Sequence, residues 1–325
     1  MSAAVAVEEL VKRYGRTVAL DGVSFAVAAG EMFALLGPNG AGKSTLLHIL
    51  CTLLKQDGGS ARIAGIEVRD NPLGARKHLG VVFQEPSLDD RLTLWENLEF
   101  HGLVYGVPLS VRRARMEEML HLVELWDWRQ ALVRTLSTGM KRRLEIARAL
   151  IHDSSILCLD EPTVGLDAQS RERIWNYLAQ LREKRGITLL VTTHYIEEVE
   201  PCDRICVIDR GRILAEGSPA ALKAAHGKAF LRVIGRDEAA EADLLAQYES
   251  RASRHGADIL IESSGNAFVE SFLAANAGRI KRLSVEEPSL ETVFLSLTGR
   301  ELRDQAAGAR ERTFQFGKQG GEHTR

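Results

Sequence analysis

The stretch MFALLGPNGAGKST, residues 32–45, decides the fold. A short apolar run at residues 33–36 predicts a buried strand, and apolar residues at helical spacing from Leu46 to Leu50 predict a helix. The glycine-rich turn between them fits the phosphate-loop pattern Gly-x-x-x-x-Gly-Lys-Ser in the strand–turn–helix context that it needs. A chance match in a chain of this composition is on the order of 1%, before that context is counted. The stretch therefore predicts a loop that binds nucleotide phosphates.

The residue types of this loop suit phosphate chemistry. Glycines allow backbone N–H groups to turn inward around phosphate oxygens, because a Cβ atom would block the approach. We expect Lys43 to reach the β- and γ-phosphates and the Ser44 hydroxyl to bind Mg²⁺. The residues expected to contact the nucleotide here are Gly37, Pro38, Asn39, Gly40, Ala41, Gly42, Lys43, Ser44 and Thr45.

A second strand is predicted to supply carboxylates. In SSILCLDEPT, residues 154–163, the apolar run Ile156–Leu159 ends in Asp160 and Glu161. Ligands of parallel sheets gather at the carboxyl ends of the strands. We expect Asp160 to bind Mg²⁺ through water, and Glu161 to orient the attacking water or accept its proton. Alone, such a pair is more often a surface turn, but with the phosphate loop upstream it predicts a nucleotide hydrolase.

The composition limits the class of protein. The 325 residues are long enough for two domains, and 45% hydrophobic with 26% charged residues is ordinary for a globular protein. The net charge is −2, so no nucleic-acid partner is expected. No apolar run approaches the roughly 20 residues of a membrane-spanning helix, and acidic residues interrupt the start, MSAAVAVEELVKRYG, where a signal peptide would stay apolar. The four cysteines lack zinc spacing and are expected to be free, buried thiols in a reducing cytoplasm.

A third stretch, LSTGMKRRLEIARAL at residues 136–150, carries an apparent contradiction. Apolar spacing predicts a helix with Ser137 as its N-cap, yet Lys141, Arg142 and Arg143 crowd its first turn. That end of a helix already carries partial positive charge, so cations there are mildly unfavourable. The basic turn is either simply solvated or part of an anion site.

Together these motifs resemble, in order, those of the ATP-binding cassette (ABC) ATPases over residues 1 to about 225. The resemblance implies an α/β P-loop fold, whose mixed, mainly parallel core sheet is accompanied by an antiparallel β subdomain and a helical subdomain. It also implies ATP and Mg²⁺ as cofactors. In this family two cassettes pack head to tail, and a signature, typically LSGGQ, covers the ATP held by the partner cassette.

The signature position is occupied here by LSTGM. By resemblance, Ser137, Thr138 and Gly139 face the γ-phosphate held by a partner chain, where backbone donors at a helix N-terminus favour an anion. The neighbouring cations then either add attraction or pair with acidic residues. Thr138 and Met140 depart from the common signature, and a Cβ atom at position 138 narrows the allowed backbone, which leaves the hydrolysis rate open.

Four further residues match positions of the family. Tyr14, in VKRYGR, matches the aromatic residue that stacks on adenine, and Asp167, in VGLD, matches the aspartate that communicates between the two sites. Gln84, in VVFQEP, matches the glutamine that contacts Mg²⁺ and the water and connects the site to a membrane partner. His194, in LLVTTH, follows a predicted strand at residues 188–191 and matches the switch histidine at the γ-phosphate.

The rest of the chain is expected to form a helical insertion, an appendage and a tail. Within a cassette of residues 1–226, residues about 85–150 form the helical subdomain, which in the family receives a helix of the membrane subunit. The WDW stretch, Trp126–Trp128, marks either that groove or core packing. We expect a C-terminal α+β appendage at residues 227–300 and a flexible, polar tail at residues 301–325.

The resemblance predicts an ATPase subunit of a membrane exporter. Two segments resemble the drug-exporter (daunorubicin-resistance-like) branch of the family: the LSTGMKRR variant and EEPSLETVFLSLTGREL, residues 286–302. The second segment also fits a generic extension that stabilises a dimer. With a single cassette per chain, the expected partners are a second cassette, identical or not, and a polytopic membrane permease. The chain would be cytoplasmic, at the inner face of the membrane. The alternatives are a soluble ABC ATPase acting on ribosomes, DNA or Fe–S assembly, and a regulatory module that binds ATP without hydrolysis.

Overall fold

The phosphate-loop stretch folds as strand, turn and helix in the computed structural model, which describes residues 3–255 and 258–298. Strand β3 spans Met32–Leu36 and is buried throughout. Helix α1 spans Lys43–Leu50, with Gly42 before it at φ 108°, a conformation open mainly to glycine. The chain divides into two compact units between Leu214 and Ala215.

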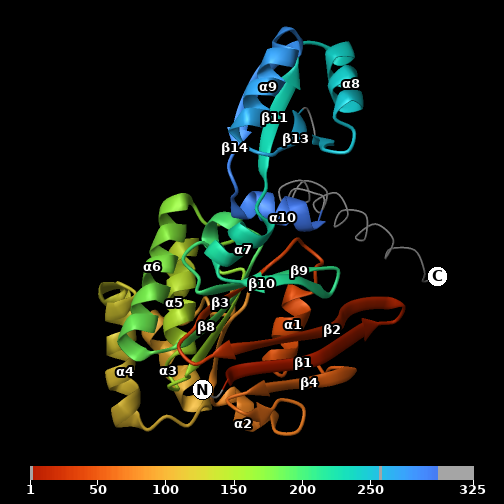
Figure 1. Ribbon diagram of the computed structural model, residues 1–325. Coiled ribbons are helices and arrows are strands. Elements are labelled where there is room, and N and C mark those ends of the chain that lie inside the picture. Colours follow the sequence, from red (N-terminus) through yellow and green to blue (C-terminus); the bar gives the residue numbers. More distant parts are fainter. Residues whose placement is uncertain (1–2, 256–257, 299–325) are drawn as a thin grey trace, which may run out of the picture. The chain divides into compact units, whose positions relative to one another are not determined.

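A six-stranded sheet with the order β10-β9-β3-β8-β7-β6 forms the centre of the first unit, and the division between the units falls within its edge strand β10 (Figure 1). The strand pairs β9–β3, β3–β8, β8–β7 and β7–β6 are all parallel. The carboxyl ends of β3, β7 and β8 therefore meet at one edge, where ligands of such sheets bind. Besides β3, the strands are β6 (Leu79–Val82), β7 (Ile156–Asp160), β8 (Thr188–Thr193), β9 (Arg204–Asp209) and β10 (Arg212–Gly217).

A second, antiparallel sheet has the order β2-β1-β4-β5. Its strands are β1 (Ala3–Tyr14), β2 (Thr17–Ala28), β4 (Gly58–Ile63) and β5 (Ile66–Glu67), followed by the short helix α2 (Pro72–Arg76). The rings of Phe25 on β2 and Phe33 on β3 stack with centroids 5.2 Å apart. Leu46 and Leu50 of α1 belong to the same buried cluster, so α1 packs between the two sheets and is fixed behind the phosphate loop.

The remaining part of the first unit is mostly helical. It consists of α3 (Leu94–Val104), α4 (Leu109–Leu122), two 3₁₀ turns at Trp126–Trp128 and Val133–Thr135, α5 (Thr138–Ala149) and α6 (Ala168–Arg185), followed by a turn at Ile196–Glu198. A capping box, in which Thr93 and Glu96 bond to each other's backbone, starts α3. Trp126 packs on Trp95 and His121, whereas Trp128 is 47% exposed, so the WDW stretch is not core throughout.

The second unit is an α+β fold. After α7 (Pro219–His226) come β11 (Ala229–Gly235), α8 (Glu238–Gln247), β12 (Ala252–His255), β13 (Asp258–Ser263), α9 (Asn266–Asn276), β14 (Ile280–Glu286) and α10 (Leu290–Thr298). The strand order β12-β13-β11-β14, antiparallel at every pair, gives a β-α-β-β-α-β arrangement of the ferredoxin-like kind. Leu231, Leu244 and Phe272 lie in its core, so α8 and α9 cover one face.

The division between the two units lies twelve residues before the expected boundary at residue 226, so helix α7 belongs to the second unit. Helix α7 packs against α10, and the Ser296 hydroxyl donates a hydrogen bond to the His226 carbonyl (2.8 Å). The tail expected from residue 301 lies outside the described residues. Within them, all four cysteines are buried and none forms a disulfide. None of the helices described is both long and apolar enough to cross a lipid bilayer.

Candidate nucleotide site

A cavity of about 320 Å³ opens at the carboxyl edge of the parallel sheet. It combines four segments that are far apart in the sequence: the start of β2, the phosphate loop, the segment after β6 and the residue after β7. Its size and polar lining suit a phosphate-bearing ligand. It is lined by Ala19, Asn39, Gly40, Gly42, Lys43, Ser44, Thr45, Gln84 and Glu161.

The glycines of the loop are required by packing as well as by a ligand. A Cβ atom on Gly37 would lie 2.2 Å from the Ile208 carbonyl oxygen, and one on Gly42 would lie 2.6 Å from that of Ala19. No side chain among the described residues caps the N-terminus of α1. Backbone N–H groups at that end are therefore available to an anion, as the phosphate-loop chemistry requires.

Lys43 is buried at the base of the loop. Its Nζ donates to the carbonyl oxygens of Gly37 (2.8 Å) and Pro38 (3.2 Å) and lies 3.3 Å from Oε1 of Glu161. Burial lowers the pKa of Lys43 even though the carboxylates of Glu161 and Asp160 favour its charged form. The cation is thus positioned inside the cavity by the loop itself and by the carboxylate opposite.

Asp160 and Ser44 form an oxygen-rich corner. The Ser44 hydroxyl donates to Oδ1 of Asp160 (3.3 Å), and the Thr192 hydroxyl donates to the same oxygen (2.5 Å). Gln84 lines the cavity and is exposed. Mg²⁺ takes oxygen ligands and retains several waters, so this set of hydroxyl, carboxylate and amide oxygens fits that ion.

Glu161 lies between two cationic or polar partners. Its Oε1 is 3.2 Å from Nδ1 of His194, in addition to its contact with Lys43. The backbone at Glu161 is left-handed, with φ 46°, and its N–H donates to the Thr192 carbonyl (3.1 Å). Burial raises the pKa of Glu161, but His194 and Lys43 together outweigh burial and lower it below the ordinary value. The carboxylate is therefore ionised at neutral pH and able to accept a proton or a hydrogen bond.

The signature residues lie outside the lining of this cavity. Ser137 caps α5, its hydroxyl accepting the Met140 N–H (3.3 Å), and both Ser137 and Thr138 are exposed. A Cβ atom on Gly139 would lie 2.9 Å from the Ser170 hydroxyl. The start of α5 thus packs on the start of α6 and presents its free end to solvent.

Tyr14 and Asp167 also lie outside the cavity lining. Tyr14 is half exposed, with the Lys12 ammonium 5.6 Å from its ring centroid. Asp167 caps α6, accepting hydrogen bonds from the N–H (2.8 Å) and hydroxyl (2.9 Å) of Ser170, and these bonds lower its pKa. The structure thus brings together the phosphate loop, Gln84, Asp160, Glu161 and His194, and leaves the other predicted residues at separate surfaces.

The basic first turn of α5 pairs with acidic residues. Lys141 forms an ion pair with Asp90 (2.8 Å), and Arg143 lies 3.6 Å from Glu124 while donating to the Tyr177 hydroxyl (3.1 Å). Of the two possibilities that the sequence leaves open for these cations, the structure supports pairing.

Arg142 and Glu145 play a part that the sequence reasoning missed. Both are buried and pair at 3.0 Å. Arg142 also donates to the carbonyl oxygens of Phe83 (2.5 Å) and Gln84 (2.8 Å), and Glu145 accepts the Ser87 N–H (2.8 Å). The helix that carries the signature is therefore bonded to the glutamine segment. Opposite charges three residues apart on the apolar side of a predicted helix were the available signal.

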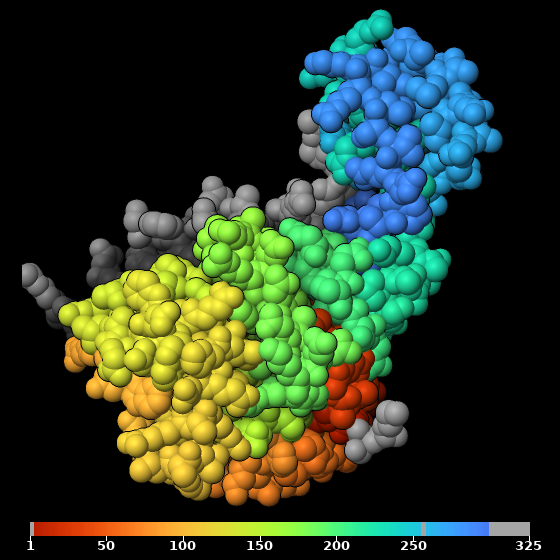
Figure 2. Space-filling model, turned by 90° about the vertical axis from the view of Figure 1, so that its left-hand side faces the viewer, coloured from red at the N-terminus to blue at the C-terminus, as the bar shows by residue number. Residues whose placement is uncertain are grey.

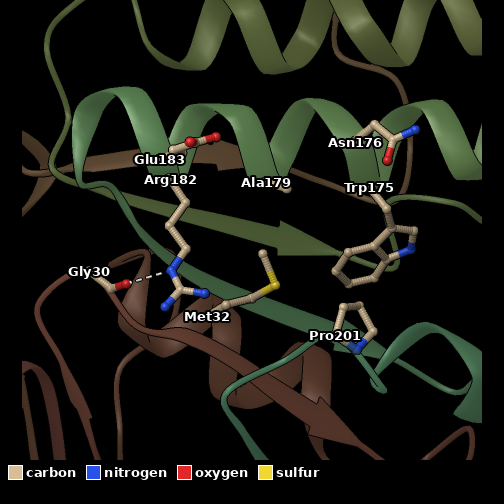
Figure 3. Close-up of a pocket in the computed structure, with 8 residues that line it drawn as sticks. All are labelled: Gly30, Met32, Trp175, Asn176, Ala179, Arg182, Glu183 and Pro201. Atoms are coloured by element: carbon tan, nitrogen blue, oxygen red, sulfur yellow. Dashed lines mark hydrogen bonds between the residues drawn. The ribbon is translucent and has the colours of Figure 1, made fainter.

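A second cavity, of about 460 Å³, lies at the start of β3 (Figure 3). Trp175 and Pro201 lie at one end and Arg182 at the other. Arg182 is already bonded to the Gly30 carbonyl (2.8 Å) and paired with Asp203 (2.7 Å). Although larger, this cavity contains none of the predicted site residues. Its lining is Gly30, Met32, Trp175, Asn176, Ala179, Arg182, Glu183 and Pro201.

The fold and the cavity define a P-loop nucleotide hydrolase. The profile of the ABC transporter family matches residues 20–164. The Nod factor export ATP-binding protein I of Ralstonia nicotianae is 41% identical over 306 residues, 92% of this chain and 95% of that protein. Its counterpart from Paraburkholderia xenovorans is 41% identical over 93% of this chain and 99% of its own. The chain belongs to the ABC transporter family, as an ATP-binding subunit, and the resemblance seen in the motifs is confirmed.

Solved structures agree with this assignment. CbiO1 of Clostridium perfringens, part of the ABC transporter complex CbiONQ, has a TM-score of 0.65 and 31% identity, over 69% of this chain and 92% of its own. The cassette MJ0796, in a dimeric post-hydrolysis state with ADP and phosphate, has a TM-score of 0.60 and 32% identity. The match covers 66% of this chain and 98% of that cassette. The predicted cassette fold is confirmed, and the activity of the family is ATP hydrolysis coupled to transport.

Proposed function

We propose that this chain hydrolyses ATP to drive export through a separate polytopic membrane subunit. The observation that carries the proposal is the Glu161 carboxylate, 3.3 Å from Lys43 Nζ and 3.2 Å from His194 Nδ1 at the phosphate-loop cavity. Such a carboxylate, ionised and facing the site of the γ-phosphate, suits activation of water. It argues against a module that only binds ATP.

Each loop residue has a separate task. Backbone N–H groups at the end of the phosphate loop and the start of α1 bind the phosphates, and the Lys43 ammonium exchanges its carbonyl partners for β- and γ-phosphate oxygens. Ser44, Gln84 and Asp160 would bind Mg²⁺, the last through water. That ion, when bound, neutralises the charge that develops on the phosphates.

Glu161 and His194 act on the water. Glu161 accepts a hydrogen bond from the water and so orients it toward the γ-phosphate. It accepts the proton of the water as the new P–O bond forms and the bond from the γ-phosphorus to the bridging oxygen breaks, which releases ADP. His194, whose Nδ1 lies 3.2 Å from Oε1 of Glu161, would restrict the orientation of that carboxylate and would lie beside the departing phosphate. The low pKa of Glu161 supports this task, because a protonated carboxyl could not accept the proton.

The site is proposed to be completed by a second cassette. Ser137, Thr138 and Gly139 would bind the γ-phosphate held by the partner chain, and Asp167 would lie at the contact between the two sites. The N-terminus of α5 is exposed and does not line the nucleotide cavity of its own chain, which supports this arrangement. Tyr14 would stack on adenine, since half of its surface is open to solvent.

The membrane subunit is proposed to bind the helical region. Several large apolar side chains of this region are more than half exposed, which is unusual unless a partner covers them. The yellow surface in Figure 2 includes α3 and α4. Export is supported by relatives named for Nod factor export, and the location would be the cytoplasmic face of the cell membrane. The exposed residues of the helical region are Phe100, Leu103, Val104 and Leu109.

The test is Glu161→Gln, purified from native membranes with ATP present. An amide keeps the shape but cannot accept the proton, so turnover should fall at least about 10²-fold while an ATP-bound dimer accumulates. A stoichiometric polytopic membrane protein should co-purify. Glu172→Gln, an exposed change on α6, is the control. Wild-type turnover would overturn the role of Glu161, and ribosomes or nucleic acid in place of a membrane protein would overturn the exporter.

A further inference from the structure

Glu198 is a buried carboxylate outside the nucleotide cavity. It ends the 3₁₀ turn Ile196–Glu198 and is 3% exposed. Its Oε2 accepts a hydrogen bond from the Thr193 hydroxyl (2.8 Å), and its Oε1 accepts one from the Thr163 hydroxyl. Both donors are themselves fully buried. One carboxylate thus bonds two segments of the chain that are 30 residues apart.

The two threonines adjoin the residues that act on water. Thr193 directly precedes His194, and its hydroxyl also accepts the Tyr195 N–H (3.0 Å). The residues on both sides of His194 are therefore fixed through a single hydroxyl, which is oriented by Glu198. Thr163 lies two residues after Glu161, in the turn where the Val164 N–H donates to the Glu161 carbonyl (3.3 Å).

The charge of Glu198 has only partial compensation. Nε of Arg171 lies 3.6 Å from its Oε1, too far for a hydrogen bond, while the Arg171 guanidinium packs 4.6 Å from the Tyr195 ring centroid. Burial raises the pKa of Glu198. The adjacent Glu197 is exposed and approaches the same arginine at 3.7 Å. Burial of a carboxylate costs free energy that a neutral residue of the same size would not cost. The presence of Glu198 at this position, bonded to two threonines, therefore calls for a functional explanation.

We propose that Glu198 is a positioning residue for hydrolysis: it aligns His194 with Glu161 by bonding to Thr193 on one side and Thr163 on the other. The inference rests on the proposed roles of Glu161 and His194. Displacement of a reacting group by about 1 Å can cost about 10²-fold in rate, so two hydrogen bonds that fix both segments affect turnover more than ATP affinity. Glu198 is not among the residues that line the nucleotide cavity.

The test measures ATP turnover and affinity in the full chain. Glu198→Ala should lower kcat by about tenfold or more, with KM for ATP and the calorimetric affinity within about twofold of wild type. Glu198→Gln should recover part of the loss, because its amide oxygen accepts from one threonine and its amide N–H donates to the other. Thr193→Val should resemble Glu198→Ala. Glu197→Gln, on the same turn, is the control and should match wild type.

A double-mutant cycle with His194→Ala separates positioning from general weakening of the fold. If Glu198 acts through His194, Glu198→Ala should lower the residual turnover of His194→Ala by less than twofold. An equal fall in both backgrounds, or wild-type kcat in Glu198→Gln and Thr193→Val, would overturn the proposal. If Glu198→Ala does not fold, those two variants decide. Normal turnover in Glu161→Gln would instead overturn the proposed function on which the inference rests.

Discussion

Glu145→Ala should destabilise the first unit strongly, because it breaks a buried ion pair on one side only. Arg142 and Glu145 are 5% and 1% exposed and lie 3.0 Å apart. Removal of one member of such a pair costs about 3–5 kcal/mol, since the other charge stays buried without its partner. The Ser87 N–H also loses its acceptor. Because Arg142 keeps two backbone carbonyls as acceptors, we expect the lower end of that range.

The assay is thermal unfolding with and without urea. For a domain of 150–250 residues, 1 kcal/mol shifts Tm by roughly 2–4 °C, so a loss of about 3 kcal/mol lowers Tm by roughly 6–12 °C. Lys141→Ala is the matched control, because it breaks a 2.8 Å pair on the same helix whose partner, Asp90, is mostly exposed. Exposed pairs contribute at most about 1 kcal/mol. A Tm for Glu145→Ala that equals the Tm of Lys141→Ala would refute the reasoning.

Two further predictions concern pH and the loop. Burial lowers the pKa of His101 to about 3, below its value of about 6.5 in an unfolded chain. The unfolded chain therefore binds the proton more strongly, and the free energy of unfolding falls as the pH drops below about 6.5. From pH 7.5 to 5.0 that loss is about 2 kcal/mol, and urea titrations of His101→Gln should lack it. Gly37→Ala should reduce ATP affinity at least tenfold by calorimetry, because its Cβ atom would lie 2.2 Å from a carbonyl oxygen. Gly278→Ala, with open space around it, should bind ATP normally.

The phosphate loop and its two acidic partners could be predicted because each is encoded locally. An apolar run of four or five residues followed by Gly-rich or acidic residues specifies a buried strand with polar groups at its end. The strands at Phe33, Ile156 and Thr188 are all present, and their parallel pairing brings Lys43 and Glu161 within 3.3 Å. That proximity follows from sheet geometry once the strands are known to be neighbours.

The contacts of Glu198 and Glu145 could not be predicted in the same way. Each carboxylate bonds to residues that are distant in sequence, Thr163 for the first and Ser87 for the second. Hydrophobic periodicity shows that such a position faces inward but does not identify its polar partner. The same limit applies to the second unit, which could be predicted as an α+β appendage, whereas the order of its strands depends on pairings such as β11 with β14.

The basic start of α5 shows why sequence position alone misjudges charge. In the first turn of a helix a cation opposes the helix dipole unless it attracts an anion or pairs with an acidic residue, and here the side chains extend away from the helix end to such partners. Lys141 reaches Asp90, and Arg142 turns inward to Gln84. Their charges are therefore largely compensated within the chain. What remains open at the helix end is the backbone around Thr138 and Gly139, so recognition of a partner's phosphate would depend on N–H donors rather than on the three cations.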